Sequence, residues 1–252
     1  MPKITIITVC FNAEQYIEQT IQSVISQKSC EFEYIIVDGA STDKTKRIIQ
    51  QYESQLTSWV SEPDGGIADA MNKGVELATG EYLLFLHADD YLADDAVLSK
   101  VISRMQTNVD IHAFDILFKT KSKEILKSTK PLGMRTYFKT PVMHQGAFCK
   151  KTLFEQLGGF NTDFKIAMDY DFFYRSFQHN VTMDIYTDLT VSVMRDTGVS
   201  SMQDWVSLKQ RFAEEKRVHL ENNTSAVMRV IYAVYWALYL PYRKVKFVVT
   251  SL

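Results

Sequence analysis

Short runs of apolar residues, with few polar positions between them, recur through the first part of the chain. Three such runs lie at residues 4–9, 34–37 and 57–60, and continuous apolar runs are typical of strands buried on both faces of a parallel sheet. Between them, apolar residues recur at helical spacing, and we expect Asn12 to cap the first of these helices. The order β, α, β, α, β predicts the doubly wound half of a nucleotide-binding α/β fold.

A fourth apolar run, residues 81–86, stops at two adjacent carboxylates, Asp89 and Asp90. In open α/β sheets ligands bind beyond the carboxyl ends of the strands, so both side chains are expected in that crevice. Adjacent carboxylates repel each other unless a cation or hydrogen-bond donors compensate, and oxygen ligands of this kind suit Mg²⁺ or Mn²⁺. The alternative is a solvated acidic turn that caps the helix beginning near Ala96.

The helix predicted from Gly66 has one apolar face and one polar face. Asp69, Asn72 and Lys73 share the polar face at i, i+3, i+4 spacing, so they can act together on a ligand. The same spacing is also satisfied by a solvated face that carries an Asp69–Lys73 ion pair. Gly80 stands where a left-handed helix C-cap is expected.

Beyond the acidic pair the pattern predicts shorter and more irregular elements. We expect a helix at residues 94–105, two hairpin strands at 109–118 and 124–128, and an irregular loop at 131–141. A strand at 144–148 then enters a short helix that two glycines end. This region is expected to supply mixed-sheet strands and the acceptor side of a cleft.

Asp169 and Asp171 begin the next predicted helix, whose apolar side chains belong in the core. Acidic residues at a helix N-terminus act as caps and complement the helix dipole. A general base aimed into the cleft would occupy the same position. The two roles are compatible, so the pattern leaves both open.

Two further helices are predicted at residues 204–222 and 224–240. The second is apolar and aromatic from residue 230 onward, and basic residues follow Pro241. This apolar stretch is shorter than the roughly 20 residues that a membrane-spanning helix needs. Aromatic residues beside a basic cluster suit an interfacial helix on an anionic membrane. The alternative is a helix packed on the protein body or on a partner subunit, including a second copy of the chain.

Composition narrows the class of protein. The chain of 252 residues is 46% hydrophobic and 12% aromatic, which suits one large packed domain with or without an appendage. The net charge of −2, without a basic block, argues against a nucleic-acid partner. The three scattered cysteines suit neither a disulfide framework nor a zinc site, so a reducing cytoplasmic setting is expected. The chain enters a strand at once, and no secretory signal is expected.

Five segments in this order resemble the motifs of the family 2 glycosyltransferases, inverting enzymes of the GT-A fold that use nucleotide-diphosphate sugars. The resemblance covers about residues 3–195. It implies an α/β protein of the GT-A fold, with a doubly wound, mostly parallel mixed sheet and a C-terminal helical appendage. The segments are Thr8-Val9-Cys10-Phe11-Asn12-Ala13-Glu14, Val37-Asp38-Gly39-Ala40-Ser41-Thr42-Asp43, residues 61–74, His87-Ala88-Asp89-Asp90 and residues 168–175.

The resemblance implies a role for each acidic motif. Asp169 would be the catalytic base, with Asp171 as a rival, because Met168 replaces a glutamate common in the family. Asp90 would hold the metal ion, Mg²⁺ or Mn²⁺, and Asp89 would contact the ribose or the metal. His144 would either touch the diphosphate or acceptor or be a buried structural histidine.

The resemblance also implies where the donor binds. The loop at residues 8–14 would close around uracil or an equivalent base, and the motif at residues 37–43 would accept a hydrogen bond from that base. Two residues of the segment 61–74 would lie near the ribose and diphosphate. The implied donor-site residues, in that order, are Thr8, Val9, Asn12 and Glu14; Asp38; and Asp64 and Lys73.

The chemistry implied by the family is one inverting displacement. Asp169 would remove the proton of an acceptor hydroxyl as that oxygen attacks C1 of the sugar, and the metal would neutralise the leaving diphosphate. The predicted function is transfer from a nucleotide-diphosphate sugar, with a UDP-sugar expected, to a lipid-linked or oligosaccharide acceptor in surface polysaccharide synthesis.

Residues 1–200 would form the catalytic domain, with a nucleotide-binding half at 1–95 and an acceptor half at 96–200. Residues 201–252 would form C-terminal helices that work at the inner face of the membrane if they bind anionic lipid.

Other function classes fit less well. A sugar nucleotidyltransferase would also need a nucleotide and Mg²⁺, but it usually has a glycine-rich phosphate loop after the first strand, where this chain has Cys10-Phe11-Asn12. A dinucleotide oxidoreductase would have a Gly-x-Gly-x-x-Gly motif at the same place, and this chain does not have it there. A non-catalytic sugar- or membrane-binding module has no need of both carboxylate sites.

Overall fold

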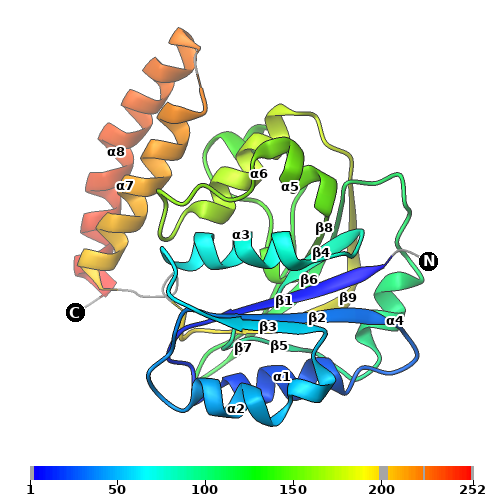
Figure 1. Cartoon of the computed structure of the whole chain (residues 1–252). Helices are drawn as coiled ribbons and strands as arrows, with labels where there is room; N and C mark the ends of the chain where they lie inside the picture. Colours follow the sequence, from blue (N-terminus) through cyan, green and yellow to red (C-terminus); the bar gives the residue numbers. More distant parts are fainter. Residues whose placement is uncertain (1–2, 199–203, 224, 251–252) are drawn as a thin grey trace.

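The computed structural model describes residues 3–198, 204–223 and 225–250. Its described residues form one nine-stranded mixed sheet in the order β3-β2-β1-β4-β8-β6-β9-β5, with β7 paired to β6 (Figure 1). The strands are β1 (Ile4–Cys10), β2 (Phe32–Asp38), β3 (Ser58–Ser61), β4 (Tyr82–Phe85), β5 (Tyr91–Leu92), β6 (Ile111–Lys119), β7 (Glu124–Lys127), β8 (Ala147–Lys150) and β9 (Met183–Arg195).

The first four strands of this order are parallel. β1 pairs in parallel with both β2 and β4, and β2 pairs in parallel with β3. Every residue of β1 and β4 is buried, which explains why their sequences are apolar without alternation. The second half adds β8, antiparallel to β4 and β6, and β9, parallel to β6. The four parallel strands, the hairpin strands β6 and β7 and the mixed sheet are confirmed. The strand predicted at residues 144–148 is only partly right, because residues 144–146 form a 3₁₀ turn and β8 begins at Ala147. The pattern did not predict β5 or β9.

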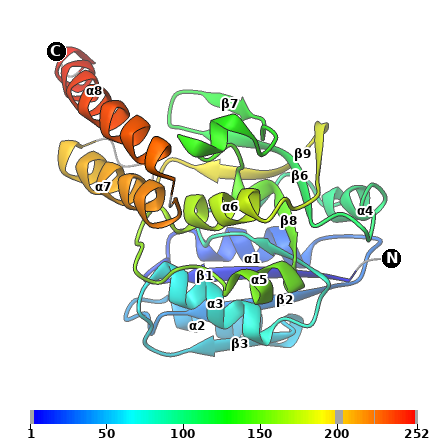
Figure 2. The same ribbon diagram turned by 90° about the horizontal axis from the view of Figure 1, so that it is seen from above.

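Helices cover both faces of the sheet (Figures 1 and 2). On one face lie α1 (Ile17–Ile25), α2 (Thr45–Gln51) and α4 (Val97–Ile102). On the other lie α3 (Ile67–Leu77), α5 (Lys151–Leu157) and α6 (Met168–Gln178). Short 3₁₀ turns complete the connections: η1 (Glu53–Gln55), η2 (Met134–Tyr137) and η3 (His144–Gly146).

Two predicted caps are wrong. The first helix begins at Ile17, and Asn12 lies outside it with a positive φ of 48°. Gly80 is not a left-handed cap, because α3 ends at Leu77 with extended backbone at Ala78. Gly80 is required for a different reason: a Cβ there would lie 2.4 Å from the hydroxyl oxygen of Thr5 in β1. The helix predicted at residues 94–105 is also shorter, since α4 spans only Val97–Ile102.

The C-terminal residues form a helical hairpin of α7 (Trp205–Glu221) and α8 (Ala226–Thr250), which leans away from the sheet in both views (Figures 1 and 2). Asp204 caps α7, accepting hydrogen bonds from the backbone of Val206 and Ser207. The helices pack through a small apolar cluster of Leu208, Phe212, Tyr232 and Trp236.

The prediction that the last helix ends before Pro241 is wrong, because α8 continues through the proline. Proline removes one helical hydrogen bond, but Phe247 beyond it packs on Trp205 of α7, with ring centroids 5.5 Å apart. Among the described helices, none is both long and apolar enough to cross a bilayer.

Candidate active site

The two loops that follow β1 and β2 are joined by reciprocal hydrogen bonds. The side-chain oxygen of Asn12 accepts from the backbone of Thr42 at 2.9 Å, and the backbone of Asn12 donates to the Ser41 hydroxyl at 2.8 Å. Glu14 accepts from the backbone of Lys44 and donates its own backbone N–H to Asp43, both at 3.0 Å. Asn12 and Glu14 therefore build a rigid rim at the carboxyl ends of two neighbouring parallel strands.

Asp38, at the end of β2, is fully buried beneath this rim. Its carboxylate accepts from the Ser61 hydroxyl at 2.7 Å and from the backbone and hydroxyl of Ser41. Thr8 and Val9 are also buried in β1, and the Thr8 hydroxyl lies 3.2 Å from that of Tyr34. These side chains form the floor of the site. Their direct contact with a nucleotide-sugar donor stays a prediction.

Phe11 also lies at this rim, although the sequence motif predicts no role for it. Its side chain is 63% exposed at the end of β1. The signal in the sequence was an aromatic residue placed directly after a buried strand. An exposed ring at this position offers a flat apolar surface to a planar ligand.

The turn between β3 and α3 brings Asp64 and Lys73 to the same end of the sheet. Asp64 accepts from the backbone of Gly66 at 2.8 Å, and its Oδ2 would lie 2.5 Å from a Cβ at Gly39. Glycine at 39 thus lets this carboxylate approach the end of β2. Lys73 lies 2.9 Å from Glu62 and 3.6 Å from Asp69, so its ammonium is held over the turn.

Asn72 does not act with its two polar neighbours on α3. Its amide donates to the carbonyl of Phe160 at 2.8 Å and accepts from the backbone of the same residue at 2.8 Å. Asn72 therefore fixes the loop after α5. The predicted three-residue face reduces to Asp69 and Lys73.

The two acidic residues after β4 have different surroundings. Asp90 is 2% exposed, and its carboxylate accepts from the backbone of Arg195 at 3.1 Å and from the Gln145 side chain. Burial, with a smaller contribution from the Asp89 charge, raises the pKa of Asp90 well above its ordinary value. Asp89 is half-buried, and its Oδ2 accepts from the Thr197 hydroxyl at 2.6 Å.

Arg195 organises this acidic end, and the motif analysis did not include it. Its guanidinium stacks over Tyr91 at 4.6 Å and Tyr16 at 5.0 Å, and it donates to the backbone carbonyl of Asp89. Thr20 adds bonds from α1 to the backbone carbonyl of Asp90 at 2.6 Å. The sequence carried no local signal for Arg195, since the chain brings it from the end of β9.

Asp169 lies in the first turn of α6, with its side chain 23% exposed. Its Oδ1 accepts from the backbone of Tyr170 at 2.6 Å, and its Oδ2 lies 3.4 Å from Nδ1 of His144. The His144 ring meets that of His87 edge to face, with centroids 5.0 Å apart. Burial, and then the neighbouring His144, lower the pKa of His87 to about 3, so His87 is neutral at pH 7.

The turn η3 connects the two carboxylate sites that the sequence predicted separately. His144 contacts Asp169, and the next residue, Gln145, hydrogen-bonds Asp90. Consecutive residues of one tight turn thus join the first turn of α6 to the end of β4. Nε2 of His144 is buried and has no hydrogen-bond partner within the described residues.

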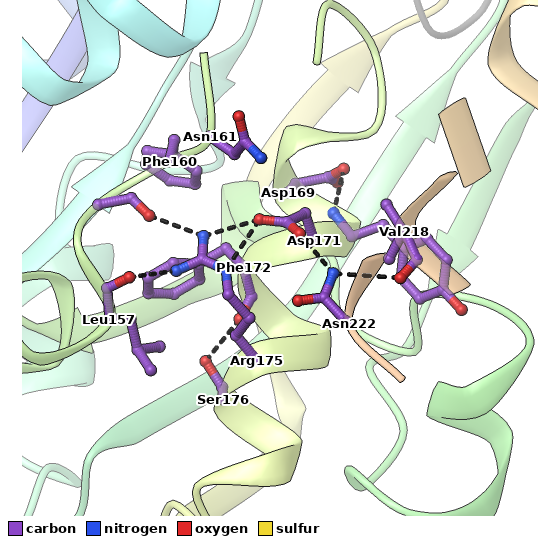
Figure 3. Close-up of polar contacts among 12 residues, drawn as sticks. Leu157, Phe160, Asn161, Asp169, Asp171, Phe172, Arg175, Ser176, Val218 and Asn222 are labelled. Carbon is purple, nitrogen blue, oxygen red and sulfur yellow. Dashed lines mark hydrogen bonds and ion pairs between the residues drawn. The ribbon is translucent and has the colours of Figure 1, made fainter. Parts of the chain in front are cut away.

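Asp171, the alternative base that the motif left open, has buried partners. It is 2% exposed and pairs with Arg175 at 2.8 Å, while Asn222 of the hairpin donates to it at 2.7 Å (Figure 3). Arg175 also donates to the carbonyl of Gly159 at 2.7 Å. A hollow of about 500 Å³ lies beside this network, and its lining does not include Asp169. Asp171 is therefore buried and paired, whereas the Asp169 side chain is partly exposed.

The two carboxylates of the acidic pair differ in how far the protein already engages them. Within the described residues Oδ1 of Asp89 has no hydrogen-bond partner, whereas the Asp90 carboxylate is buried and bonded. In the same part of the chain, no group of three His, Cys, Asp or Glu side chains is arranged to hold a metal.

Known proteins resemble the chain in sequence. A family model described as "Glycosyl transferase family 2" matches residues 5–173. A PGL/p-HBAD biosynthesis glycosyltransferase of Mycobacterium bovis is 30% identical over 207 residues, which cover 78% of each chain. The putative teichuronic acid biosynthesis glycosyltransferase TuaG of Bacillus subtilis is 44% identical over 92 residues, covering 35% of this chain and 36% of TuaG.

Solved structures resemble it in fold. TarS of S. aureus in complex with UDP-GlcNAc has a TM-score of 0.66 at 18% identity, over 87% of this chain and 71% of that one. The mannosyltransferase PcManGT of Pyrobaculum calidifontis, in complex with GDP-Man and Mn²⁺, has a TM-score of 0.63 at 21% identity, over 96% and 82%. At these identities the likeness extends to the fold alone.

Proposed function

Because this chain belongs to glycosyl transferase family 2, we propose that it moves a sugar from a nucleotide-diphosphate sugar to an acceptor hydroxyl with inversion, using Asp169 as general base. The chain is a transferase with the mixed α/β GT-A fold. The observation that carries the finer proposal is the turn η3, which ties Asp169 to the acidic end of β4 through His144 and Gln145.

The position of Asp169 suits proton removal from an acceptor. The carboxylate is partly exposed, and the backbone N–H of Tyr170 and the helix N-terminus stabilise its negative charge. It accepts the hydroxyl proton while the hydroxyl oxygen forms its bond to C1 and the bond from C1 to the diphosphate oxygen breaks. The hydroxyl oxygen supplies the electron pair of the new bond, and the diphosphate oxygen leaves with the pair of the broken bond. This one displacement inverts the anomeric carbon without a covalent enzyme intermediate.

We assign the metal-holding role to Asp89, in place of the Asp90 expected from the motif. The accessible oxygen of Asp89 suits Mg²⁺ or Mn²⁺, whereas metal ligation by Asp90 would require its buried bonds to Arg195 and Gln145 to break. When bound, such a cation supplies charge neutralisation to the leaving diphosphate. Asp90 would then hold the end of β4 in place for Asp89.

The donor nucleotide is proposed to lie over the rim of the β1 and β2 loops. Phe11 would stack on the base, and the loop that Asn12, Glu14 and Asp38 hold would contact its edge through backbone groups. Asp64 and Lys73 would face the ribose and diphosphate. A UDP-sugar is the proposed donor and a GDP-sugar the alternative, since the similarly folded TarS and PcManGT are in complex with UDP-GlcNAc and GDP-Man.

The acceptor is proposed to be a lipid-linked or oligosaccharide alcohol in surface polysaccharide synthesis. Support comes from relatives named for teichuronic acid and PGL/p-HBAD biosynthesis. In this proposal residues 1–95 hold the donor, residues 96–200 the acceptor, and residues 201–252 the appended helices. A sugar nucleotidyltransferase is disfavoured, because family 2 members transfer sugars and the β1 loop lacks a glycine-rich phosphate motif.

We further propose that α8 lies on an anionic membrane at the cytoplasmic face. One side of α8 packs on α7, and the opposite side exposes a continuous apolar stripe. A helix that is apolar on both sides requires cover. The helix contains no acidic residue, and its basic residues flank the stripe, which complements anionic lipid. The stripe consists of Val227, Val230, Ile231, Val234, Leu238, Tyr242, Val245, Val248 and Val249.

A screen of donor hydrolysis tests the proposed activity. The full chain is incubated with Mn²⁺ and a panel of UDP- and GDP-sugars, and release of the nucleoside diphosphate is measured. Slow hydrolysis of one donor class, stopped by EDTA, is the expected result. If no nucleotide sugar is bound or hydrolysed while the protein is folded, the proposed function is wrong.

A further inference from the structure

Four cationic side chains and one carboxylate, Glu215, gather where the turn η2 meets the helical hairpin. They come from three separate segments: Arg135 and Lys139 from the turn η2 and its end, Arg211 from α7, and Arg243 from α8. Arg211 lies 3.5 Å from Glu215, and the Lys139 backbone donates to the Arg135 carbonyl at 3.1 Å. These four residues are called the basic cluster below.

Aromatic packing holds the basic cluster in place. Phe138, next to Lys139, packs on Tyr235 of α8 with ring centroids 5.1 Å apart. Arg243 lies over the Phe212 ring at 4.8 Å and donates to the Tyr239 hydroxyl at 2.7 Å. The cations therefore stand on a rigid base where the η2 segment meets the helical hairpin.

The cluster carries more positive charge than its carboxylate balances. Burial lowers the pKa of Lys139, and Arg211, Arg135 and Arg243 lower it further, while Glu215 opposes them. Burial also raises the pKa of Glu215, and the charge of Asp169 adds to this effect. Cations that crowd one another in this way are stabilised by an added anion.

The neighbours of the cluster indicate which anion it would meet. The turn η2 lies beside the proposed base, because the hydroxyl of Tyr170, the residue after Asp169, donates to the carbonyl of Thr136 in that turn at 2.9 Å. On α7, Glu214 accepts from the backbone of Ala167, two residues before Asp169, at 3.0 Å. The donor rim, by contrast, is built by residues at the ends of β1, β2 and β3. On α8, Tyr242 and Val245 of the exposed apolar stripe flank Arg243 and Lys244 in sequence.

We propose that the basic cluster binds a phosphate or diphosphate group of the acceptor, and so brings the acceptor hydroxyl to Asp169. A guanidinium group can bind phosphate in a bidentate manner, through two parallel hydrogen bonds. Several cations together match a group with more than one negative charge. The acceptor is then a phosphate-bearing glycan or lipid. This inference rests on the proposed function, since it names the substrate class of the same site.

Binding of inorganic pyrophosphate tests the proposal without turnover. The full chain is titrated with pyrophosphate in EDTA by calorimetry, and separately with UDP and Mn²⁺. In the double variant Arg211→Gln with Arg243→Gln, pyrophosphate affinity is expected to fall roughly tenfold or more, with UDP affinity unchanged. The matched control is Lys209→Gln with Lys216→Gln, which removes the same charge from exposed positions of α7 outside the cluster. Lys139→Gln, which changes a different segment of the cluster, provides a second variant if the double variant does not fold.

Three results would overturn the proposal. The first is equal pyrophosphate affinity in the cluster and control variants, or no measurable affinity in the unmodified chain. The second is a parallel loss of UDP affinity, which would assign the cluster to the donor. The third is loss of binding to phosphatidylglycerol vesicles with pyrophosphate affinity retained, which would assign it to a lipid headgroup. Failure of UDP binding in the unmodified chain would instead count against the proposed function.

Discussion

Nδ1 of His144 lies 3.4 Å from Oδ2 of Asp169, and the side chain of the following residue bonds Asp90. The base and the acidic end of β4 are thus positioned by one short turn. A displacement of about 1 Å at a reacting group can cost about 100-fold in rate, so the turn is expected to affect catalysis although His144 need not touch the substrate.

We predict that His144→Ala lowers kcat by about 10- to 100-fold with little change in the KM for the donor, because Asp169 loses its lateral contact. The measurement is steady-state transfer with the donor and acceptor varied separately. His179→Ala, which removes an exposed histidine at the end of α6, is the control. Equal rates in the His144 variant and the control would contradict a positioning role.

The two acids of α6 are expected to behave differently when changed to their amides. Asp169→Asn should lower kcat by at least about 100-fold, because the base is lost, and leave Mn²⁺-dependent UDP binding intact. Asp171→Asn should instead destabilise the fold by about 3 kcal/mol, because Arg175 loses its buried partner. Activity assays, UDP calorimetry and urea denaturation of both variants distinguish the roles. If Asp171→Asn is stable and inactive while Asp169→Asn is active, the assignment is reversed.

Substitutions of the two acidic residues after β4 should also have different effects, one on metal-dependent binding and the other on stability. Asp89→Ala is expected to abolish the Mn²⁺ dependence of UDP binding with a small effect on unfolding, since Asp89 is half-buried. Asp90→Ala is expected to lower the melting temperature, because the Arg195 backbone and Gln145 lose their buried acceptor. Calorimetry with and without Mn²⁺, beside thermal melts, provides the measurement. Unchanged Mn²⁺-dependent binding in Asp89→Ala would reject that residue as the metal ligand.

The sequence predicted the sheet well and the roles of single residues less well. Buried strands such as β1 and β4 are readable because a strand covered on both faces must be apolar throughout. The carboxyl ends of those strands then locate the motifs. Which of Asp89 and Asp90 faces outward was not readable, because that depends on Arg195, which lies more than a hundred residues away in the chain.

The errors share a physical cause, namely partners distant in sequence. Asn12 has the local pattern of a helix cap, but its side-chain oxygen accepts a hydrogen bond from the backbone of Thr42 in the neighbouring loop. Gly80 has the pattern of a C-cap, but the constraint is its close approach to Thr5. Pro241 is a helix breaker in isolation, yet α8 continues because its last turns pack on α7.

Stability should fall on acidification through His219. Its ring is fully buried, its Nδ1 accepts from the Trp236 indole at 3.0 Å, and its Nε2 lies 2.8 Å from the Tyr170 hydroxyl. Burial lowers the pKa of His219 to about 4. Between pH 6.5 and 4 the unfolded chain therefore binds a proton that the folded chain does not, so the free energy of unfolding decreases as pH falls, by up to about 3 kcal/mol. His87 acts in the same direction, because its pKa is also lowered.

Urea denaturation at pH 7.5, 6 and 5 measures this dependence. His219→Gln, which does not titrate in this range, should be less stable at pH 7.5 and should show a shallower dependence on pH. If the free energy of unfolding of this variant depends on pH as steeply as that of the unmodified protein, then a group other than His219 is responsible. Protonation of His219 removes the acceptor of the Trp236 indole, so Trp236 fluorescence should also change as pH falls.

The exposed stripe of α8 predicts binding to anionic vesicles. Val234→Glu with Leu238→Glu places two charges in the centre of the stripe, at positions that are 55% and 69% exposed. Because these side chains lie at the surface, the change in stability should stay within about 1 kcal/mol. Binding to phosphatidylglycerol vesicles in flotation should fall roughly tenfold or more, since buried apolar area is replaced by charge.

Ala213→Glu, at an exposed position of α7, is the control for added charge and should float with the vesicles like the unmodified chain. Raising the salt concentration should weaken binding of all three proteins in part, because the basic flank of α8 contributes through screened charges. If the unmodified chain ignores anionic vesicles, and sedimentation shows a dimer that the Val234 and Leu238 substitutions dissociate, then a second copy of the chain covers the stripe and the membrane proposal is wrong.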